Sequence, residues 1–442
     1  MMKELLRMVI MDQREMIWND SFVPRELPDR FLIGNPVVVI TGIRRCGKST
    51  LLHQIRSVRK EKDYFLNFDD ERLIRFTVEH FQVLHELFIE LFGEQKTFYF
   101  DEIQNISGWE RFIRRLSDYG YNIFITGSNA RMLSRELGTH LTGRYIQLEL
   151  YPFSFREYLM YTHQEITDRD RASTAGRAKL SRWFNEYLTT GGFPAYLENR
   201  NELYLQSLYE SILYRDVLVR NNLTNEKEVL ELVYYLASNV AGPSSYNSLR
   251  KIIGIKNATT IRNYIGFIQD TYLLFQVSKY DPSLNKQVVN PKKTYFIDNS
   301  LVLKLGFSFS VQSGRLLENL VFIELKRRGK QVYYHQGRTE CDFVVREGNR
   351  ITEVLQVCYL FKEPGVADRE VRGLTEAMAQ YRLNQGTIIT TDTETTLQQE
   401  GYTIRVVYAW RWMMERRETR DERLKTKRSE RSEDPGTPGL RD

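Results

Sequence analysis

The chain has 442 residues, more than one hydrophobic core of ordinary size can organise, so several domains are expected. Hydrophobic residues make up 42% of the chain, which is ordinary for a globular protein. Lys and Arg number 63 against 57 Asp and Glu. A net charge of +6 on so large a surface permits a nucleic-acid partner without arguing for one.

Cysteine usage and hydropathy indicate a cytoplasmic protein with no membrane partner. Cys46, Cys341 and Cys358 lie far apart and the six histidines are scattered, so neither a zinc site nor a disulfide framework is predicted. No apolar run of the sequence approaches the roughly 18 residues that span a bilayer. Acidic residues interrupt the first 20 positions, unlike a signal peptide.

Residues 1 to about 30 place apolar and charged residues at helical spacing, which predicts a helix and a connector into the first strand. A helix on a membrane surface is the alternative. It would need a basic face, whereas acidic residues are mixed into this segment.

A nucleotide-binding signature follows. Residues 37–52 read VVVITGIRRCGKSTLL, in which a β-branched run leads into the G-x-x-x-x-G-K-[ST] pattern and a helix-like run follows. Glycines let backbone N–H groups curl around phosphates, and the helix N-terminus adds partial positive charge. Lys48 can then reach the β- and γ-phosphates while the Ser49 hydroxyl ligates Mg²⁺. The predicted nucleotide contacts are Gly42, Ile43, Arg44, Arg45, Cys46, Gly47, Lys48, Ser49 and Thr50.

Strands and helices alternate from residue 37 to 150, which predicts a parallel sheet covered on both faces. The predicted strands are 37–41, 64–68, 97–100, 122–126 and 145–150. The third strand ends in Asp101 and Glu102, where a P-loop enzyme holds its Mg²⁺ and activates water. The fourth ends in the run Thr126-Gly127-Ser128-Asn129, whose polar side chains could touch the γ-phosphate or the water; an ordinary strand-ending turn is the alternative.

The segments GIRRCGKST, FYFDEIQNISGW, FITGSNA and LTGRY, in this order, resemble AAA-type ATPases of archaea and bacteria that carry a winged helix and a nuclease-like C-terminal domain. They also share features with signalling-type archaeal ATPases. The resemblance covers roughly residues 20 to 415. It implies a five-stranded core with a catalytic glutamate, and ATP rather than GTP as the nucleotide.

The same resemblance implies further site residues. Ser128 or Asn129 would be the sensor at the fourth strand, and Arg144 a candidate arginine for the γ-phosphate, within the chain or across a subunit interface. Gly192 and Pro194, in a helical lid, would lie against the nucleotide; a sharp turn between helices is the alternative.

Residues 226 to 300 read as helix, helix, turn, helix, strand, polar loop and strand, which is typical of a winged helix-turn-helix. Apolar residues share one face of the third helix and leave Thr260, Arg262 and Asn263 outward. Lys286, Lys292 and Lys293 lie in or beside the wing. DNA contact through this helix and these lysines is one interpretation; a protein-contact or lid-support module is the other.

Residues 312 to 413 resemble the PD-(D/E)xK nuclease superfamily in their order of elements. Glu318 and Asp342 match its first two acidic positions. Gln356 stands at the third and lacks the negative charge that holds a divalent metal, and Cys358 cannot supply an ammonium. Glu353 does not substitute, because it points to the opposite face of its strand. A nuclease-like domain without activity is therefore expected, retaining either a binding role or only its fold.

The overall prediction is an α/β protein with a P-loop NTPase parallel sheet, a helical lid, a winged helix-turn-helix and a C-terminal α/β nuclease-like domain. We expect an ATP- and Mg²⁺-dependent switch or motor, with DNA as a candidate partner and a homo-oligomer left open. The alternatives are a DNA-binding or protein-directed regulator with very slow turnover and an ATP-dependent nuclease. The predicted bounds are 1–150 for the ATPase core, 151–225 for the lid, 226–305 for the winged helix, 306–414 for the nuclease-like domain and 415–442 for a charged, disordered tail.

Overall fold

The structure is a computed structural model that describes residues 2–16, 22–26, 31, 37–128, 144–306 and 313–415. The candidate sensor Asn129 and the charged tail beyond residue 415 lie outside the described residues. Of the connector predicted within residues 1 to 30, the structure describes 2–16 and 22–26.

The P-loop domain, residues 37–150, is built on one parallel sheet. Its five strands lie in the order β2-β3-β4-β1-β5. They are β1 (Val37–Thr41), β2 (Tyr64–Asn67), β3 (Thr97–Asp101), β4 (Asn122–Gly127) and β5 (Tyr145–Glu149). The three central strands are buried along almost their whole length, as expected of a parallel sheet between two helical layers. The predicted strands are confirmed to within one residue at each end.

Alternation of side chains assigns a helical layer to each face of this sheet. Val38 and Ile40 of β1 point into a core shared with α2, while Val37 and Val39 point into a second core shared with α1, α3 and α4. These helices are α1 (Met2–Glu15), α2 (Lys48–Arg59), α3 (Phe81–Phe92) and α4 (Trp109–Asp118), with short 3-10 turns η2 (Glu71–Leu73), η3 (Val78–His80) and η4 (Ile103–Asn105) between them.

A helical segment follows the P-loop domain. It consists of α6 (Phe155–Tyr161), α7 (Asp168–Ala172), α8 (Thr174–Thr190), α9 (Pro194–Asn199), α10 (Glu202–Ser211) and the π-helix η5 (Ile212–Val219). Ser154 begins α6 with a capping box, and Pro194 opens α9 at a position where a missing N–H costs nothing. A π-helix of 8 residues is rare and marks η5 as a segment of interest.

The next part, residues 226–298, is the three-helix unit. Its helices α11 (Glu226–Ser238), α12 (Tyr246–Ile253) and α13 (Ala258–Asp270) pack on a three-stranded sheet of order β6-β8-β7. The strands are β6 (Pro243–Ser244), β7 (Leu274–Ser278) and β8 (Lys292–Phe296). The predicted helices and strands are present in the predicted order. The predicted polar loop instead contains the short helix α14 (Leu284–Val289), whose apolar residues Leu284, Val288 and Val289 are exposed.

The C-terminal sheet unit, residues 313–415, has six strands in the order β13-β14-β12-β11-β10-β9. They are β9 (Gln331–Gln336), β10 (Glu340–Glu347), β11 (Arg350–Cys358), β12 (Gln385–Thr390), β13 (Thr395–Gln399) and β14 (Tyr402–Tyr408). One face packs on α16 (Ser313–Arg327) and the other on α17 (Val366–Tyr381), and α18 (Ala409–Met414) ends the described chain. The edge strand β13 escaped prediction because it is mostly exposed and polar.

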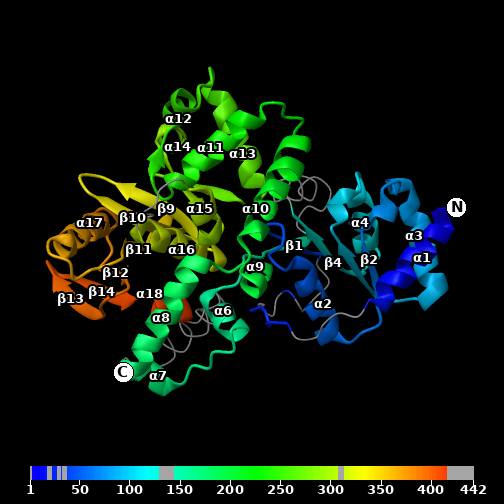
Figure 1. Ribbon diagram of the computed structural model, residues 1–442, viewed down its shortest axis with the longest axis horizontal. Coiled ribbons are helices and arrows are strands. Elements are labelled where there is room, and N and C mark those ends of the chain that lie inside the picture. Colours follow the sequence, from blue (N-terminus) through cyan, green and yellow to red (C-terminus); the bar gives the residue numbers. More distant parts are fainter. Residues whose placement is uncertain are drawn as a thin grey trace, which may run out of the picture.

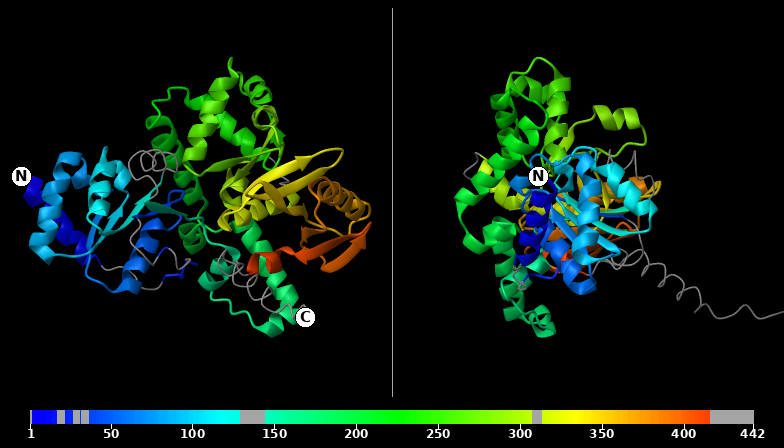
Figure 2. Two further views of the ribbon diagram at one scale, coloured as in Figure 1. Left: turned by 180° about the vertical axis from the view of Figure 1, so that it is seen from behind. Right: turned by 90° about the vertical axis from the view of Figure 1, so that its right-hand side faces the viewer.

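The P-loop domain and the C-terminal sheet unit lie at opposite ends of the molecule, with the helical segment and the three-helix unit between them (Figure 1, Figure 2). One apolar cluster runs from α2 through the intervening helices to α16, so these parts share a continuous core. The helix α15 (Asn299–Leu305) lies in this core and joins the three-helix unit to α16. Among the described residues, no helix combines the length and apolar character needed to cross a bilayer.

A single buried amide joins β8 to α16. Asn319, fully buried on α16, accepts a hydrogen bond from Phe296 N–H at 2.7 Å and donates one to the Phe296 carbonyl at 3.0 Å. Its Nδ2 also donates to Asn299 Oδ1 at 2.9 Å. The amide therefore satisfies backbone groups of β8 that no water would reach.

We expect Asn319→Ala to lower the free energy of unfolding by about 3 kcal/mol, because it leaves two backbone groups of Phe296 buried without partners. Urea denaturation followed by far-UV circular dichroism measures the change. Gln380→Ala, an exposed amide on α17, is the matched control and should change the stability by less than about 0.5 kcal/mol. Equal effects of the two substitutions would show that the Asn319 amide stabilises nothing.

Candidate functional site

The phosphate-binding loop lies between the end of β1 and the start of α2. Gly42 has φ 153°, and a Cβ atom there would lie 2.2 Å from the Leu150 carbonyl oxygen, so a side chain is excluded. Gly47 precedes α2 with φ 99°, a conformation that glycine adopts at little cost. Between them Arg45 is exposed with φ 66°, and Ile43 and Cys46 are buried. The loop thus wraps the N-terminus of α2, as phosphate binding requires.

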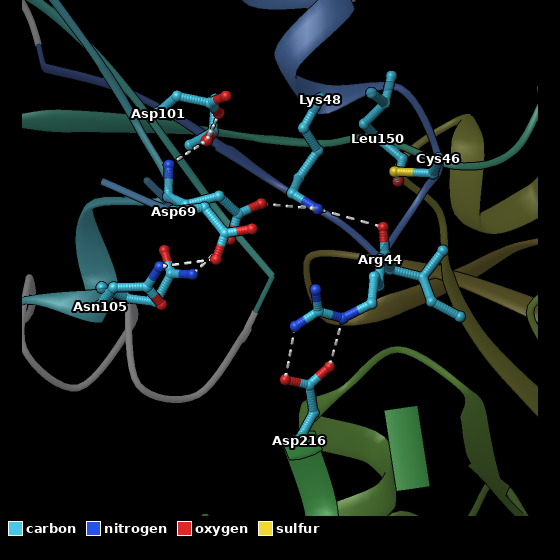
Figure 3. A network of polar contacts seen from close by, with 12 residues as sticks. Arg44, Cys46, Lys48, Asp69, Asp101, Asn105, Leu150 and Asp216 are labelled. Carbon is cyan, nitrogen blue, oxygen red and sulfur yellow. Dashed lines mark hydrogen bonds and ion pairs between the residues drawn. The ribbon is translucent and has the colours of Figure 1, made fainter. Parts of the chain in front are cut away.

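Lys48, the first residue of α2, is buried but charged. Its Nζ donates to the Ile43 carbonyl at 3.2 Å and lies 3.6 Å from Glu102 Oε1 (Figure 3). Burial opposes the charge most strongly, but Glu102, Cys46 and Asp101 together outweigh it, and the pKa of Lys48 is raised. An ammonium is therefore held in the loop, and Glu102 is its salt-bridge partner among the residues that the structure describes.

Thr126 organises the two acidic residues predicted at the end of β3. Its hydroxyl donates to Asp101 Oδ1 and accepts from the Glu102 backbone N–H at 2.9 Å. Glu102 has φ 50°, a strained conformation for a non-glycine residue, and Gln104 donates to its Oε2 at 2.6 Å. Sequence reasoning noticed Thr126 only as part of a strand end, because its two bonds reach residues 24 and 25 positions away.

The two acidic residues suit different ligands: Asp101 a hydrated divalent cation, and Glu102 the attacking water. Burial, together with the neighbouring Glu102, raises the pKa of Asp101 to about 6. Its buried Oδ2 has no hydrogen-bond partner among the described residues, which leaves one hard oxygen for Mg²⁺ close to the hydroxyl-bearing Ser49 at the start of α2. The residues present therefore fit the predicted metal site.

Ser128 follows β4, between the ends of β3 and β1 in the sheet. Its side chain is 3% exposed, and its Oγ has no hydrogen-bond partner among the described residues. A buried hydroxyl without a partner is costly unless a ligand or water completes it. This supports Ser128 as the sensor, which remains a prediction.

The position of Arg144 requires a correction. Arg144 precedes β5, and its carbonyl accepts a hydrogen bond from Val37 N–H, at the amino ends of β5 and β1. Its guanidinium pairs with Asp118 on α4. The phosphate-binding loop lies at the other end of β1, roughly 16 Å away along five residues of strand. An action on the γ-phosphate within the same chain is therefore wrong, and an action across a subunit interface stays a prediction.

Gly192 and Pro194 lie at the turn between α8 and α9. The Gly192 N–H donates to Asp298 Oδ2 at 2.7 Å, and its carbonyl accepts from Phe153 N–H at 2.7 Å. A Cβ on Gly192 would lie 2.2 Å from the Phe153 carbonyl oxygen. Close packing thus explains the glycine, and contact with the nucleotide stays a prediction for both residues.

The π-helix η5 is joined to the phosphate-binding loop, which sequence reasoning did not anticipate. The Arg44 guanidinium makes two hydrogen bonds to Asp216, at 3.0 and 3.1 Å, and Asp216 is 2% exposed (Figure 3). The next residue toward the N-terminus, Arg215, pairs with Asp69 after β2 at 2.9 Å. Because Arg44 and Asp216 are 172 positions apart, no local pattern could reveal the pair.

A segment before β1 also braces the loop. The Arg25 guanidinium donates to the carbonyl oxygens of Cys46, at 3.4 Å, and Tyr151. It forms an ion pair with Glu157 of α6 at 2.9 Å, and both side chains are 6% exposed. Gln54 of α2 donates to the Val23 carbonyl at 2.8 Å. The loop is thus supported by chain that both precedes and follows the sheet.

The candidate DNA contacts are only partly where the sequence predicts. Arg262 and Asn263 of α13 and Lys286 are exposed, and Thr260 is half-buried. Lys292 donates to the carbonyl oxygens of Gln287 and Val288. Lys293 is 1% exposed and cannot touch a nucleic-acid phosphate, which corrects the prediction for this residue.

A lysine of the three-helix unit contacts the acidic residues that match the nuclease pattern. Lys293 Nζ lies 2.8 Å from Glu318 Oε1 and 3.0 Å from Asp342 Oδ1. Gln356 is buried, and burial raises the pKa of the Cys358 thiol to about 12. Within the described part of the chain, no three His, Cys, Asp or Glu side chains are arranged to hold a metal ion. These positions therefore do not fit a nuclease metal site.

Comparison with known proteins agrees with the geometry of the P-loop domain. Residues 34–159 match the family model described as "AAA domain", and residues 181–311 match one described as "Domain of unknown function (DUF8612)". The protein named "Uncharacterized protein MJ1544" of Methanocaldococcus jannaschii is 33% identical over 432 residues, which cover 93% of this chain and 96% of that protein. A protein of Haemophilus influenzae is 29% identical over 351 residues, 74% of this chain and 83% of that protein.

Among solved structures, the Holliday junction branch migration motor RuvB of Thermotoga maritima aligns with a TM-score of 0.23 and 14% identity, over 62% of this chain and 88% of that chain. McrB of Thermococcus gammatolerans, in AAA+ hexamers with bound McrC, aligns with a TM-score of 0.18 and 15% identity, over 41% of this chain and 47% of that chain. At these scores neither likeness carries an argument.

The parallel sheet, the phosphate-binding loop and the matched domain together define a P-loop protein with an AAA-type ATPase domain. More narrowly, the chain belongs to the family of the Methanocaldococcus jannaschii protein MJ1544, to which it is similar over almost its entire length.

We expect Thr126→Val to lower the turnover of ATP by about 10²-fold while nucleotide affinity changes little, because the valine keeps the strand packed but releases Asp101 and Glu102. Steady-state phosphate release and a fluorescent-nucleotide titration measure the two effects. Thr97→Val, at the other end of β3, is the matched control and should leave turnover within about twofold. Unchanged turnover in Thr126→Val would remove Thr126 from the site.

Proposed function

We propose that this protein is a Mg²⁺-dependent ATPase whose hydrolysis cycle switches the arrangement of its helical segment and three-helix unit. The observation that carries the proposal is the clamp at the end of β3, where one threonine hydroxyl holds Asp101 and Glu102 opposite the buried Lys48 ammonium. Three charged groups in a fixed array are what phosphoryl transfer to water needs, since its catalysis is mainly positioning and electrostatic stabilisation.

The contacts of Lys48 and Glu102 suggest how these residues would change roles when nucleotide binds. Lys48 is bonded to the Ile43 carbonyl and paired with Glu102. Phosphates in the loop offer Lys48 stronger partners, so the ammonium would leave Glu102. Glu102 would then accept a proton from the attacking water. Gln104 and the bond from the Glu102 backbone N–H to Thr126 hold Glu102 in place for this step. Mg²⁺, when bound by Ser49 and Asp101, supplies charge neutralisation between the phosphates.

Two contacts would carry the state of the loop to the rest of the chain. Arg44 ties the loop to Asp216 of η5, and the Tyr272 hydroxyl donates to Thr41 Oγ1 at 2.7 Å. Thr41 ends β1, directly before the loop, and Tyr272 directly precedes Leu273 and β7 in the three-helix unit. Movement of the loop on nucleotide binding would therefore bear on both parts, which supports a switch.

We expect Glu102→Gln to slow ATP hydrolysis by roughly 10²- to 10⁴-fold with binding intact, because the amide keeps the shape but cannot accept the proton. Lys48→Ala should instead lose nucleotide binding, since it removes the ammonium that faces the phosphates. Phosphate release and equilibrium binding of a fluorescent ATP analogue distinguish the two variants. A Glu102→Gln protein that hydrolyses ATP as fast as the wild type would contradict the assignment.

A second candidate function is DNA-stimulated turnover, with the three-helix unit as a winged helix-turn-helix. The supporting observation is the exposed pair Arg262 and Asn263 on α13, whose opposite face is buried through Ile261, Ile265 and Ile268. An exposed helix face that carries an arginine and an asparagine fits a major groove. The competing proposal is a protein-directed switch with slow turnover, in which the same face contacts a protein.

Phosphate release by the wild type and by Lys48→Ala, each with and without single- and double-stranded DNA, separates these proposals. A DNA-stimulated enzyme should show a several-fold rise that Lys48→Ala abolishes and that Arg262→Ala reduces, because Arg262 would contact the duplex. Arg182→Ala, an exposed arginine on α8, is the control for a general loss of positive charge. Turnover indifferent to DNA in every variant would favour the protein-directed switch.

A further inference from the structure

One lysine of the three-helix unit reaches into the C-terminal sheet unit. Lys293 lies on β8, and its side chain is 2% exposed. Its Nζ is 2.8 Å from Glu318 Oε1, 2.5 Å from Glu340 Oε1 and 3.0 Å from Asp342 Oδ1. Carboxylates from α16 and β10 thus surround a single ammonium that belongs to another part of the fold.

This ammonium stands where the sequence predicted ligands for a divalent cation. Glu318 and Asp342 are the two acidic residues that match the nuclease pattern, and one oxygen of each forms an ion pair with Lys293. The second oxygen of Asp342 accepts from Val357 N–H at 3.0 Å, and Glu318 Oε1 also accepts from the Tyr295 hydroxyl at 2.7 Å.

The residue at the third position is committed elsewhere. Gln356 Oε1 accepts from the Asp342 backbone N–H at 3.2 Å, and its Nε2 donates to Glu370 Oε2 at 2.5 Å. Its carbonyl oxygen already accepts a hydrogen bond and carries no full charge, so it is a weaker ligand for a divalent cation than the carboxylate it replaces. The residues here therefore do not fit a metal in the present arrangement.

We propose that Lys293 is a built-in cation, here called the plug. Its ammonium fills the carboxylate site formed by Glu318, Glu340 and Asp342 and excludes a divalent cation for as long as β8 is docked. Removal of the ammonium would leave three carboxylates converging on one point, which is an unfavourable arrangement in a buried site. A hard divalent cation is the counter-charge that these carboxylates would favour once they rearrange into a coordination shell, which their present positions do not form.

The docking of β8 makes the plug part of a larger contact. Phe296, on the same strand, is bonded through its N–H and carbonyl to Asn319 of α16. Beyond the neighbouring strand β7, Tyr280 N–H donates to the Tyr334 carbonyl of β9 at 2.8 Å. Undocking of β8 together with Lys293 would therefore break the Phe296–Asn319 contacts as well. The inference concerns this contact and does not depend on ATP hydrolysis.

Binding of Mn²⁺ without nucleotide, followed by electron paramagnetic resonance, tests the proposal. Every protein carries Asp101→Asn, which removes the only carboxylate among the metal ligands predicted in the P-loop domain. The protein with Lys293 should bind Mn²⁺ at least tenfold more weakly than Lys293→Met, which should take up one ion per chain. Lys293→Arg keeps a cation in the site and should also exclude Mn²⁺, and Lys293→Met with Asp342→Asn should lose the ion again.

Two results would overturn the proposal: equal Mn²⁺ affinity with and without Lys293, or a folded Lys293→Met protein that binds none. Lys293→Met could unfold because of its unpaired carboxylates, so thermal unfolding is followed at increasing Mn²⁺ concentration. A rise in Tm that is absent from the double variant with Asp342→Asn supports the plug. No rise in either variant overturns it as well.

Discussion

Buried ionic groups from distant parts of the chain hold this molecule together. Arg44 meets Asp216, Arg25 meets Glu157, and Lys293 meets the acidic residues of α16 and β10. Each pair joins two structural parts, and each would leave a charge without its partner in a poorly hydrated place if the parts separated. Breaking one side of such a pair is costly, whereas the pair as a whole adds little stability over apolar packing. These contacts therefore fix how the parts are arranged more than how stable they are.

In the P-loop domain, too, a polar side chain contacts residues that are distant in the sequence. One hydroxyl, that of Thr126, bonds both to the side chain of Asp101 and to the backbone of Glu102, and this second bond holds Glu102 in a strained conformation. Strain of this kind persists where surrounding contacts over-determine it, which is common at sites of function. Ser128, with a buried hydroxyl lacking a partner among the described residues, follows the same strand. Asp101, Glu102 and Ser128 thus follow or end neighbouring strands at the edge of the sheet where the nucleotide is predicted to bind.

Local patterns in the sequence predicted the strands of the P-loop domain, the loop before α2 and the acidic pair after β3, because each depends on neighbouring residues. They could not predict which distant groups meet. Lys293 reads as an ordinary basic residue beside a wing, yet its partners lie 25 to 49 positions away and bury it. Arg144 was misplaced for a related reason: its sequence context says nothing about which end of the sheet it occupies, whereas parallel pairing of β5 with β1 decides this. No local pattern in the sequence indicated that Asp216 contacts Arg44.

The contacts form a continuous route between the two ends of the molecule. Thr41, at the end of β1, is bonded to Tyr272. Tyr272 leads into β7, which pairs with β8, and β8 carries Lys293 into the carboxylates of the C-terminal sheet unit. Continuity alone does not establish coupling, which requires an element with two arrangements that both sites bias. Strand β8 is the candidate for such an element, since its docking satisfies Lys293 and Asn319 together and its undocking would release both. A nucleotide-driven shift of the end of β1 would thus act on Lys293 through β7 and β8.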